Sequence, residues 1–339
     1  MISVVIPTFN NKEQLLQNLK KNAIFFGINE LNKTAGVASE VTLREADFPP
    51  AAGRASQERR DHERQNLPHI KEIIVVNDNP NINLQPDLKK YSTLRLIQNK
   101  KNLGFSGAAD RGIREAESSH ILLLNDDVRL TDNTYQNALD YFKDESTFAV
   151  SFTQKEKDEA LVGKNKLYWA SGMLFHSKAK DINKGINAWA EGGAALIDKK
   201  KYEILGGLDQ LYNPFYWEDI DLSYQAWKQG YKVMFDPDIV VVHHHESTIS
   251  SNFSNQFIKT IAYRNQFIFI WKNIYDLPFI LKHILFLPYH LLYYMLKGEL
   301  GFVIGFLEAL KKIGAILNKR SLSNRQRVLS DREILKLFT

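Results

Sequence analysis

The chain contains no cysteine among its 339 residues. This absence excludes disulfide frameworks, cysteine-ligated zinc or iron–sulfur centres and cysteine nucleophiles. The sequence also opens without a basic segment followed by a long apolar stretch, so we expect no signal peptide and a cytoplasmic, bacterial location. Its longest uncharged apolar run, residues 283–296, would rise about 21 Å as a helix, less than the roughly 30 Å hydrocarbon core of a bilayer. With Pro288 inside the run, we expect an in-plane segment rather than a transmembrane span.

Positive charge is concentrated at one end of the chain. The whole sequence carries a net charge of +5, but residues 257–339 hold 13 Lys and Arg against 5 Asp and Glu. The first 256 residues are therefore mildly acidic. We predict two regions: a domain over 1–256 and a basic, amphipathic helical region over 257–339 that associates with a membrane or forms oligomers.

The first region alternates short apolar strands with helical patterns, which is typical of an α/β fold with a mainly parallel sheet and helices on both faces. Asn10 and Glu13 resemble a capping box at the start of the first helix. Residues 34–68 have little apolar periodicity, and we interpret them as a flexible insertion. The predicted strands are Ile2–Ile6, Ile73–Val76, Leu94–Ile97, Ile121–Leu124, Leu167–Phe175 and Ile239–Val242, and a helix is predicted over Trp217–Gln229 with Gly230 as its stop.

Polar residues follow each of the first four strands. Ligands of such sheets bind at the carboxyl ends of the strands, so these residues are candidates for one shared site rather than four separate turns. They are Pro7, Thr8, Phe9 and Asn10; Asn77 and Asp78; Asn102, Gly104 and Phe105; and Asn125, Asp126 and Asp127.

Two acidic motifs and one histidine motif could carry chemistry. Adjacent carboxylates after a buried strand, at Asp126 and Asp127, suit a hard cation such as Mg²⁺ or Mn²⁺, although an acidic surface turn has the same composition. Glu218, Asp219 and Asp221 open a helix beside aromatic residues. They either complement the helix dipole or include a general base for a hydroxyl group.

His243, His244 and His245 end a strand, where one of them could be a metal ligand or all could be polar strand-end residues. Other site classes fail on spacing. The glycines after the third strand do not form a dinucleotide or Walker motif, and neither a nucleophile elbow nor a zinc-binding His-Glu-x-x-His is present. The basic surplus coincides with apolar helices, so we expect no nucleic-acid partner.

The order of these motifs resembles an inverting family 2 glycosyltransferase of the GT-A fold, most closely the rhamnosyltransferase-like branch of bacterial cell-surface polysaccharide synthesis. The resemblance runs from Ile2 to about Ser250, apart from the insertion. The segments that carry it are residues 4–10, 74–79, 102–107, 123–127, 192–195, 218–222 and 241–244.

The resemblance implies a role for each motif. Asp219 would be the general base, with Glu218 beside it as a catalytic and acceptor-binding residue. Asp127 and His243 would bind a divalent metal, Mn²⁺ or Mg²⁺, and Gly193 and Trp217 would contact the acceptor. The donor would be held by Pro7, Thr8, Phe9, Asn10, Asn77, Asp78, Asn102, Gly104, Phe105, Asn125 and Asp126.

The implied reaction transfers one sugar from a UDP- or dTDP-sugar, with inversion, to a glycan or lipid-linked acceptor at the inner face of the cytoplasmic membrane. The family's processive Gln-x-x-Arg-Trp motif is absent. Two other classes stay open at this point: a non-catalytic sugar-nucleotide or polysaccharide-binding paralogue, and a metal-dependent nucleotidyltransferase. The C-terminal helices would dock on the membrane or form a homo-oligomer.

Overall fold

The computed structural model describes residues 1–27, 70–91, 93–243, 253–323 and 327–339. The predicted insertion at 34–68 lies outside the described residues. So do His244 and His245, which leaves His243 as the only histidine of that motif whose surroundings can be given.

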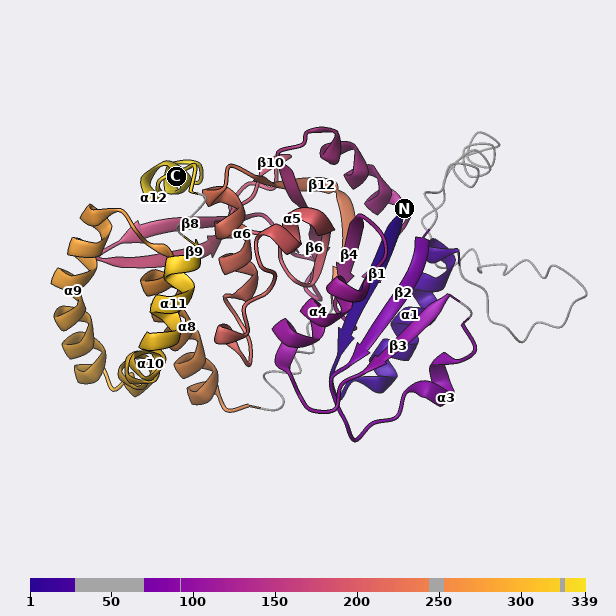
Figure 1. The fold of residues 1–339 in the computed structure, drawn as a ribbon, viewed down its shortest axis with the longest axis horizontal. Coiled ribbons are helices and arrows are strands. Elements are labelled where there is room, and N and C mark those ends of the chain that lie inside the picture. Colours follow the sequence, from indigo (N-terminus) through magenta and orange to yellow (C-terminus); the bar gives the residue numbers. More distant parts are fainter. Residues whose placement is uncertain (28–69, 92, 244–252, 324–326) are drawn as a thin grey trace, which may run out of the picture.

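A mixed, mostly parallel sheet forms the centre of the protein (Figure 1). Its strand order is β10-β12-β6-β11-β4-β1-β2-β3, and β1 pairs in parallel with β2 and β4. Strand β11 runs antiparallel to both of its neighbours. The predicted α/β class is confirmed. The strands are β1 (Ile2–Thr8), β2 (Ile70–Asn77), β3 (Leu94–Gln98), β4 (His120–Leu124), β5 (Val128–Leu130), β6 (Thr147–Lys155), β7 (Leu161–Val162), β10 (Gly185–Ile186), β11 (Ala194–Asp198) and β12 (Lys232–His243).

Helices cover both faces of this sheet. Every residue of β1 is buried, and successive side chains enter different cores because strand side chains alternate. Val5 packs in the core on the α4 side (Gly104–Glu115), whereas Val4 joins Leu15 in the core on the α1 side (Lys12–Phe26). The remaining short helices of this part are α3 (Gln85–Leu88), η2 (Thr134–Lys143), α5 (Lys199–Ile204), η3 (Gln210–Tyr212) and α6 (Glu218–Lys228).

Two local predictions are wrong. The capping box of Asn10 with Glu13 does not form: α1 starts after Asn11, which has no side-chain cap, because the side chains of Asn10 and Asn11 bond to neighbouring loops instead. The single strand predicted over Leu167–Phe175 is a hairpin of β8 (Asn165–Ala170) and β9 (Met173–Lys178). Its two turn residues have φ of 47° and 75°, as in a type I′ turn, and such a turn hardly interrupts the apolar pattern.

The C-terminal helices gather at the end of the molecule opposite β1–β3 (Figure 1). They are α8 (Asn255–Asn273), α9 (Leu277–Leu296), α10 (Leu300–Lys311), α11 (Ile313–Ser323) and α12 (Asp331–Lys336). Helix α8 is a core element, since Phe267, Ile268 and Phe269 belong to the same apolar cluster as Ala195 of the sheet. The predicted boundary after residue 256 thus falls in the first turn of a helix that shares its core with the sheet.

Helix α9 has 20 residues and continues through Pro288. At 1.5 Å per residue it is about 30 Å long, so the length argument drawn from the 283–296 run alone does not hold. Within the described residues it is the one helix long and apolar enough to cross a membrane, judged by length and composition. Only 11% of its apolar window is buried.

Candidate functional site

The loops after β1, β2 and β4 meet at one edge of the sheet. The backbone N–H of Asp78 donates to the carbonyl of Thr8 at 2.9 Å, and the Thr8 hydroxyl donates to Oδ2 of Asp126 at 2.6 Å. Three motifs that are distant in sequence therefore lie together. In the first loop Pro7 and Thr8 are buried, Phe9 is half-buried and Asn10 is exposed.

A row of asparagines on α1 holds the acidic loop in place. Asn11 donates to Oδ1 of Asp126 at 3.1 Å, Asn18 donates to the Asp126 carbonyl at 2.9 Å, and Asn22 donates to the Val128 carbonyl at 3.1 Å. Burial raises the pKa of Asp126 to about 7, despite hydrogen bonds from Thr8 and Asn11 that oppose the rise. Sequence reasoning missed this row, although polar residues at helical spacing on an apolar face were its signal.

The second loop is braced by its own side chains. Asp78 is buried, and its Oδ1 accepts from Asn99 at 2.7 Å and from the Leu103 backbone at 2.9 Å. Burial raises the pKa of Asp78, while these hydrogen bonds lower it. The amide of Asn77 donates to Gln98 at 2.9 Å and is 2% exposed. Both side chains therefore shape the loop, and a contact of either one with the donor stays a prediction.

The start of α4 brings the third loop against the glycine pair. The Asn102 side chain accepts from the Gly104 backbone at 2.7 Å, as in an Asx turn. Phe105 then points its ring at Gly192, where a Cβ would lie only 2.8 Å from the ring. Glycine at position 192 thus lets the predicted donor loop approach β11 closely.

Asp127 and His243 form a buried pair at the end of β4 and β12. Nε2 of His243 lies 3.0 Å from Oδ1 of Asp127. On the other side of the ring, Nδ1 faces the side-chain oxygen Oε1 of Gln154, because the side-chain nitrogen of Gln154 donates to Glu191. Glu191 is held in turn by Asn165 at 2.8 Å. These contacts let Nδ1 donate to Gln154, while Nε2 faces the carboxylate of Asp127.

A cation fits between two such groups. Oδ1 of Asp127 is buried beside Nε2 of His243, and a carboxylate oxygen and a neutral imidazole nitrogen are both metal-ligand atoms. No group of three or more His, Asp or Glu side chains is gathered around one point in the described part of the chain. Mg²⁺-type sites use one or two carboxylates and complete their shell with water and substrate phosphates, so this pair suits such an ion only together with a phosphate ligand.

The glycine pair joins this metal-type pair to the acidic helix. A Cβ at Gly193 would lie 3.2 Å from the Asn125 amide and 3.3 Å from the His243 ring, so a larger residue here would press on both side chains. The Asn125 backbone N–H also donates to the Gly193 carbonyl at 3.0 Å. One residue earlier, the Gly192 N–H points at Oδ2 of Asp219 at 3.4 Å. Asp127, His243 and Asp219 therefore border one turn from two sides.

Glu218 and Asp219 have perturbed proton affinities. Burial, reinforced by the neighbouring Asp219, raises the pKa of Glu218 to about 8. Burial and the charge of Glu191 raise the pKa of Asp219 to about 6. At neutral pH Asp219 is then mostly a carboxylate that can accept a proton, whereas Glu218 is mostly neutral and can donate a hydrogen bond. The two neighbours are suited to different roles.

Trp217 does not face the site mouth as its assignment to the acceptor requires. It is 4% exposed, and its ring packs on Phe269 at 5.3 Å and His176 at 5.2 Å. The chain takes φ of 70° and 78° at Tyr216 and Trp217, and this backbone turn directs the indole inward. Tyr216 is 41% exposed instead.

Asp221, the third acid of the helix, is a structural residue. Lys272 of α8 is buried between Asp221 and Asp209, at 2.7 Å from a carboxylate oxygen of each. The other oxygen of Asp221 accepts from the Tyr212 hydroxyl at 2.8 Å and from Asn273 at 2.7 Å. These contacts tie α6 to α8 and leave Asp221 no open lone pair toward a substrate.

Helix α8 also fixes the loop before the acidic motif. The fully buried amide of Asn265 donates to the carbonyls of Tyr212 at 2.7 Å and of Phe215 and Tyr216 at 2.9 Å each. Arg264 adds a hydrogen bond to Tyr212 at 3.2 Å. Nothing in the sequence pattern indicated this function, because Arg264 and Asn265 lie in a segment predicted only as a basic amphipathic helix.

Residues 63–205 match the family model described as glycosyl transferase family 2. This part of the chain is similar to that family. No curated protein matches the sequence. The match includes the Asp127 motif and the glycine pair, whereas Asp219 and His243 lie beyond it. Membership in the rhamnosyltransferase-like branch is not decided by this match.

Solved structures share the fold at low identity. GalNAc-T7 with UDP, GalNAc and Mn²⁺ has a TM-score of 0.54 and 14% identity over 82% of this chain and 48% of its own. The present chain thus spans about half the length of that protein. The mannosyltransferase PcManGT from Pyrobaculum calidifontis, with GDP-Man and Mn²⁺, has a TM-score of 0.48 and 14% identity over 96% and 83%. S. aureus TarS 1-349 has a TM-score of 0.47 and 12% identity, over 84% of this chain and 70% of its own. The shared fold is of the GT-A type.

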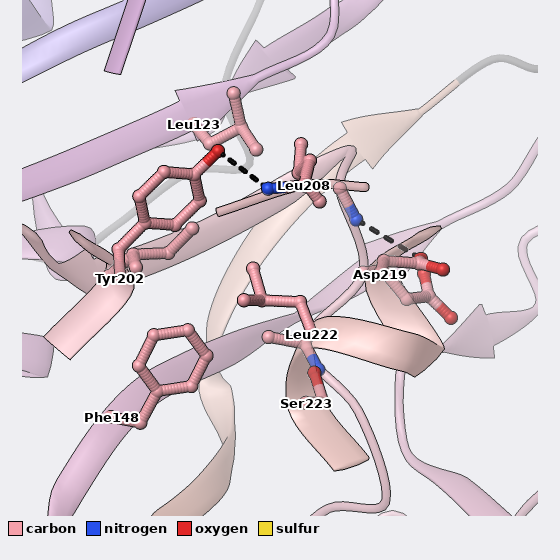
Figure 2. Close-up of a pocket in the computed structure, with 11 residues that line it drawn as sticks. Leu123, Phe148, Tyr202, Leu208, Asp219, Leu222 and Ser223 are labelled. Atoms are coloured by element: carbon pink, nitrogen blue, oxygen red, sulfur yellow. Dashed lines mark hydrogen bonds between the residues drawn. The ribbon is translucent and has the colours of Figure 1, made fainter. Parts of the chain in front are cut away.

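Figure 2 shows a small cavity behind Asp219, with the Gly192 N–H bonded to that carboxylate. Its volume of about 10 Å³ is that of one water molecule, and its walls include Phe148, Leu208 and Leu222. A space of this size and character admits no sugar. It leaves Asp219 few polar neighbours on its inner side, which agrees with the raised pKa of the carboxyl group.

Proposed function

We propose that this chain is an inverting, metal-dependent glycosyltransferase that moves one sugar from a UDP- or dTDP-sugar to a glycan or lipid-linked acceptor, within the rhamnosyltransferase-like branch. The observation that carries the proposal is the turn at Gly192 and Gly193. The Asp127–His243 pair borders it on one side, and Asp219 with its raised pKa borders it on the other. A diphosphate site and a base for a hydroxyl are the two parts that sugar transfer requires.

In this proposal Asp219 accepts the proton of the acceptor hydroxyl, and the oxygen of that hydroxyl forms a bond to the anomeric carbon. The bond from that carbon to the diphosphate oxygen breaks, and the nucleoside diphosphate leaves with the electron pair. Attack from the opposite face inverts the carbon. Asp127 and His243 would hold a divalent cation, which when bound neutralises charge on the diphosphate. The loop from Thr8 to Asn10 would hold the nucleotide.

Substitution of Asp219 by asparagine tests the central step. The variant keeps the size of the side chain but cannot accept a proton at neutral pH, so we expect transfer to fall by about 10²–10⁴-fold with nucleotide binding retained. Donor binding is followed by thermal shift with Mn²⁺ and UDP or dTDP, and turnover by release of nucleoside diphosphate. Full activity in this variant would remove Asp219 as the base.

The product distinguishes the other two classes. A nucleotidyltransferase releases pyrophosphate instead of a nucleoside diphosphate, and a non-catalytic paralogue binds a nucleotide sugar without turning it over under any metal or acceptor. We expect nucleoside diphosphate to be the product.

We also propose that the chain docks peripherally on the inner face of the cytoplasmic membrane through α9. In this helix polar residues are buried and apolar residues are exposed. Its buried residues are His283 and His290, whose ring nitrogens lie 2.7 Å from the carbonyl oxygens of the β8–β9 turn. Its outer face is apolar and exposed along its length, and comprises Leu277, Leu281, Ile284, Leu285, Tyr289, Leu292, Tyr293, Met295 and Leu296.

An in-plane position follows from the histidine anchors. They fix one side of α9 to the hairpin, so the helix can expose only its other side to lipid. Lys282 and Lys297 flank the stripe and are exposed, which suits an anionic surface. Some of the positive charge of the basic region 257–339 is used within the protein. Arg320 donates to the Trp271 carbonyl at 2.7 Å, and Arg327 pairs with Asp276 at 2.8 Å. Arg325 lies outside the described residues.

Flotation of the full chain with phosphatidylglycerol/phosphatidylethanolamine vesicles tests this docking. We expect the double variant Leu281→Glu, Leu285→Glu to lose vesicle binding, whereas Leu161→Glu, the same change at an exposed leucine of β7, keeps it. Light scattering is measured in parallel. If the double variant binds vesicles normally but turns a dimer into a monomer, the stripe is a homo-oligomer interface and the membrane proposal is wrong.

A further inference from the structure

Four aromatic rings form one cluster beside the acidic motif. Phe215 is buried at its centre and contacts Tyr216 at 4.9 Å, Phe253 at 5.3 Å and Phe257 at 6.3 Å between ring centroids. Phe253 and Phe257 stack on each other at 5.1 Å with planes 19° apart. The three outer rings are 39–41% exposed. Three large rings are thus partly open to solvent, and Tyr216 among them lies near Glu218.

The backbone that presents Tyr216 is strained. Two successive residues other than glycine, Tyr216 and Trp217, have φ of 70° and 78°, a backbone conformation that side chains with a Cβ rarely adopt. The buried amide of Asn265 holds the strained turn through the Phe215 and Tyr216 carbonyls. The strain has one visible result: the indole enters the core and the Tyr216 ring stays outside.

Glu218 supplies a second, independent sign of a ligand. It is 6% exposed, and its Oε2 is buried without a hydrogen-bond partner among the residues that the structure describes. A buried carboxyl oxygen of this kind is normally satisfied, so its natural partner is a group that arrives with a ligand. Burial, with the charge of Glu218, raises the pKa of Tyr216, as expected for neighbouring groups.

We infer that Tyr216, Phe253 and Phe257 form the surface on which the sugar ring of the acceptor packs, with Glu218 bonding one of its hydroxyl groups. A pyranose has an apolar C–H face and a polar edge, and an aromatic surface beside one orphaned carboxyl oxygen matches both. Tyr216 and Glu218 lie within three residues of Asp219, at the start of α6 (Glu218–Lys228), so a sugar placed there would have its hydroxyl near the base. This inference rests on the proposed function and transfers to Tyr216 the contact predicted for Trp217.

Saturation-transfer NMR on the full chain with Mn²⁺ and UDP tests the surface. The probes are the methyl glycosides of rhamnose, glucose, galactose and N-acetylglucosamine, which carry no lipid. We expect at least one to bind, with a dissociation constant about tenfold higher in Tyr216→Ala and Phe257→Ala. Tyr216→Phe keeps the ring and should bind within about twofold of the wild type. The matched control Tyr168→Ala, another exposed ring on β8, should change nothing.

Donor hydrolysis without acceptor separates this inference from the proposed function. If the wild type hydrolyses no nucleotide sugar and binds no nucleotide, the proposed function has failed. If donor hydrolysis is normal but Tyr216→Ala binds the glycosides like Tyr168→Ala, the aromatic surface is refuted. Failure of all four glycosides to bind, or equal binding of octanol and octyl glycosides, also overturns it, since the rings then do not recognise a sugar. Loss of donor hydrolysis in Tyr216→Ala would likewise show a structural role only.

Discussion

Replacing Asn265 by alanine tests whether α8 holds the catalytic loop in its active shape. The substitution removes the buried donor of the Phe215 and Tyr216 carbonyls, while the Tyr212 carbonyl keeps its bond from Arg264. A buried acceptor left without a partner costs about 1–3 kcal/mol. With two such carbonyls, and some relaxation of the loop, we expect the free energy of unfolding to fall by about 2–4 kcal/mol.

The functional effect should exceed what stability alone explains. Without its anchor the strained turn at Tyr216 and Trp217 can relax, and Asp219, two residues on, moves with it. A displacement of about 1 Å can cost about 10²-fold in rate, so we expect a loss of this size in kcat. Binding of UDP with Mn²⁺, which in the proposed function uses the loop after β1 and the Asp127–His243 pair, should be unchanged.

Urea unfolding, turnover and nucleotide thermal shift are measured on Asn265→Ala beside Asn318→Ala, which removes an exposed amide from α11. The control should match the wild type in all three. If Asn265→Ala loses less than about 0.5 kcal/mol, or keeps its full kcat while destabilised, the loop does not depend on α8 and the reasoning is refuted.

Three further predictions concern the site and its support. The value of kcat/KM should rise through about pH 6 as Asp219 loses its proton, and fall above about pH 8 as Glu218 loses its own. The variant Glu218→Gln should abolish the fall above about pH 8. An unchanged fall in that variant would contradict the assignment. Gln154→Leu removes the acceptor of the His243 ring proton and should weaken Mn²⁺ binding in the presence of UDP by about 10–100-fold, read by electron paramagnetic resonance; unaltered binding would rule out the tautomer argument. Lys272→Met leaves two buried carboxylates without their shared cation and should lower the free energy of unfolding by about 3–5 kcal/mol in urea titration, whereas a near-neutral result would mean that they become protonated.

Much of the sheet domain could be predicted because its signals are local. Short apolar runs mark strands that are buried on both faces, and polar residues after them mark the edge where parallel strands end. The contact of Thr8 with Asp126 is a direct result of that topology. The capping box failed because Asn10 and Asn11 have partners in other loops, which no spacing reveals. The hairpin at 165–178 was missed because its turn preserves the apolar pattern.

The C-terminal region shows the limit of composition. Charge counts found a basic surplus, and apolar spacing found helices, but neither could tell which face of a helix is covered. In α9 the histidines are inside and the leucines outside, whereas α8 buries Arg264, Asn265 and Lys272 in the core of the sheet domain. Side chains that are polar can enter a core when partners meet them, and those partners are fixed only by tertiary contacts.

By itself the sequence determined that the chain has no cysteine chemistry, that it forms an α/β sheet, and that acids follow two of its elements. Those properties depend on residue types and on spacing along the chain, which folding does not alter. Only the tertiary structure decided which acid has which environment. Asp221 is neutralised by Lys272, Asp219 borders an apolar cavity, and Asp127 faces His243 across 116 residues of sequence. Proton affinity and ligand geometry depend on burial and on neighbours in space, and the fold brings those neighbours together.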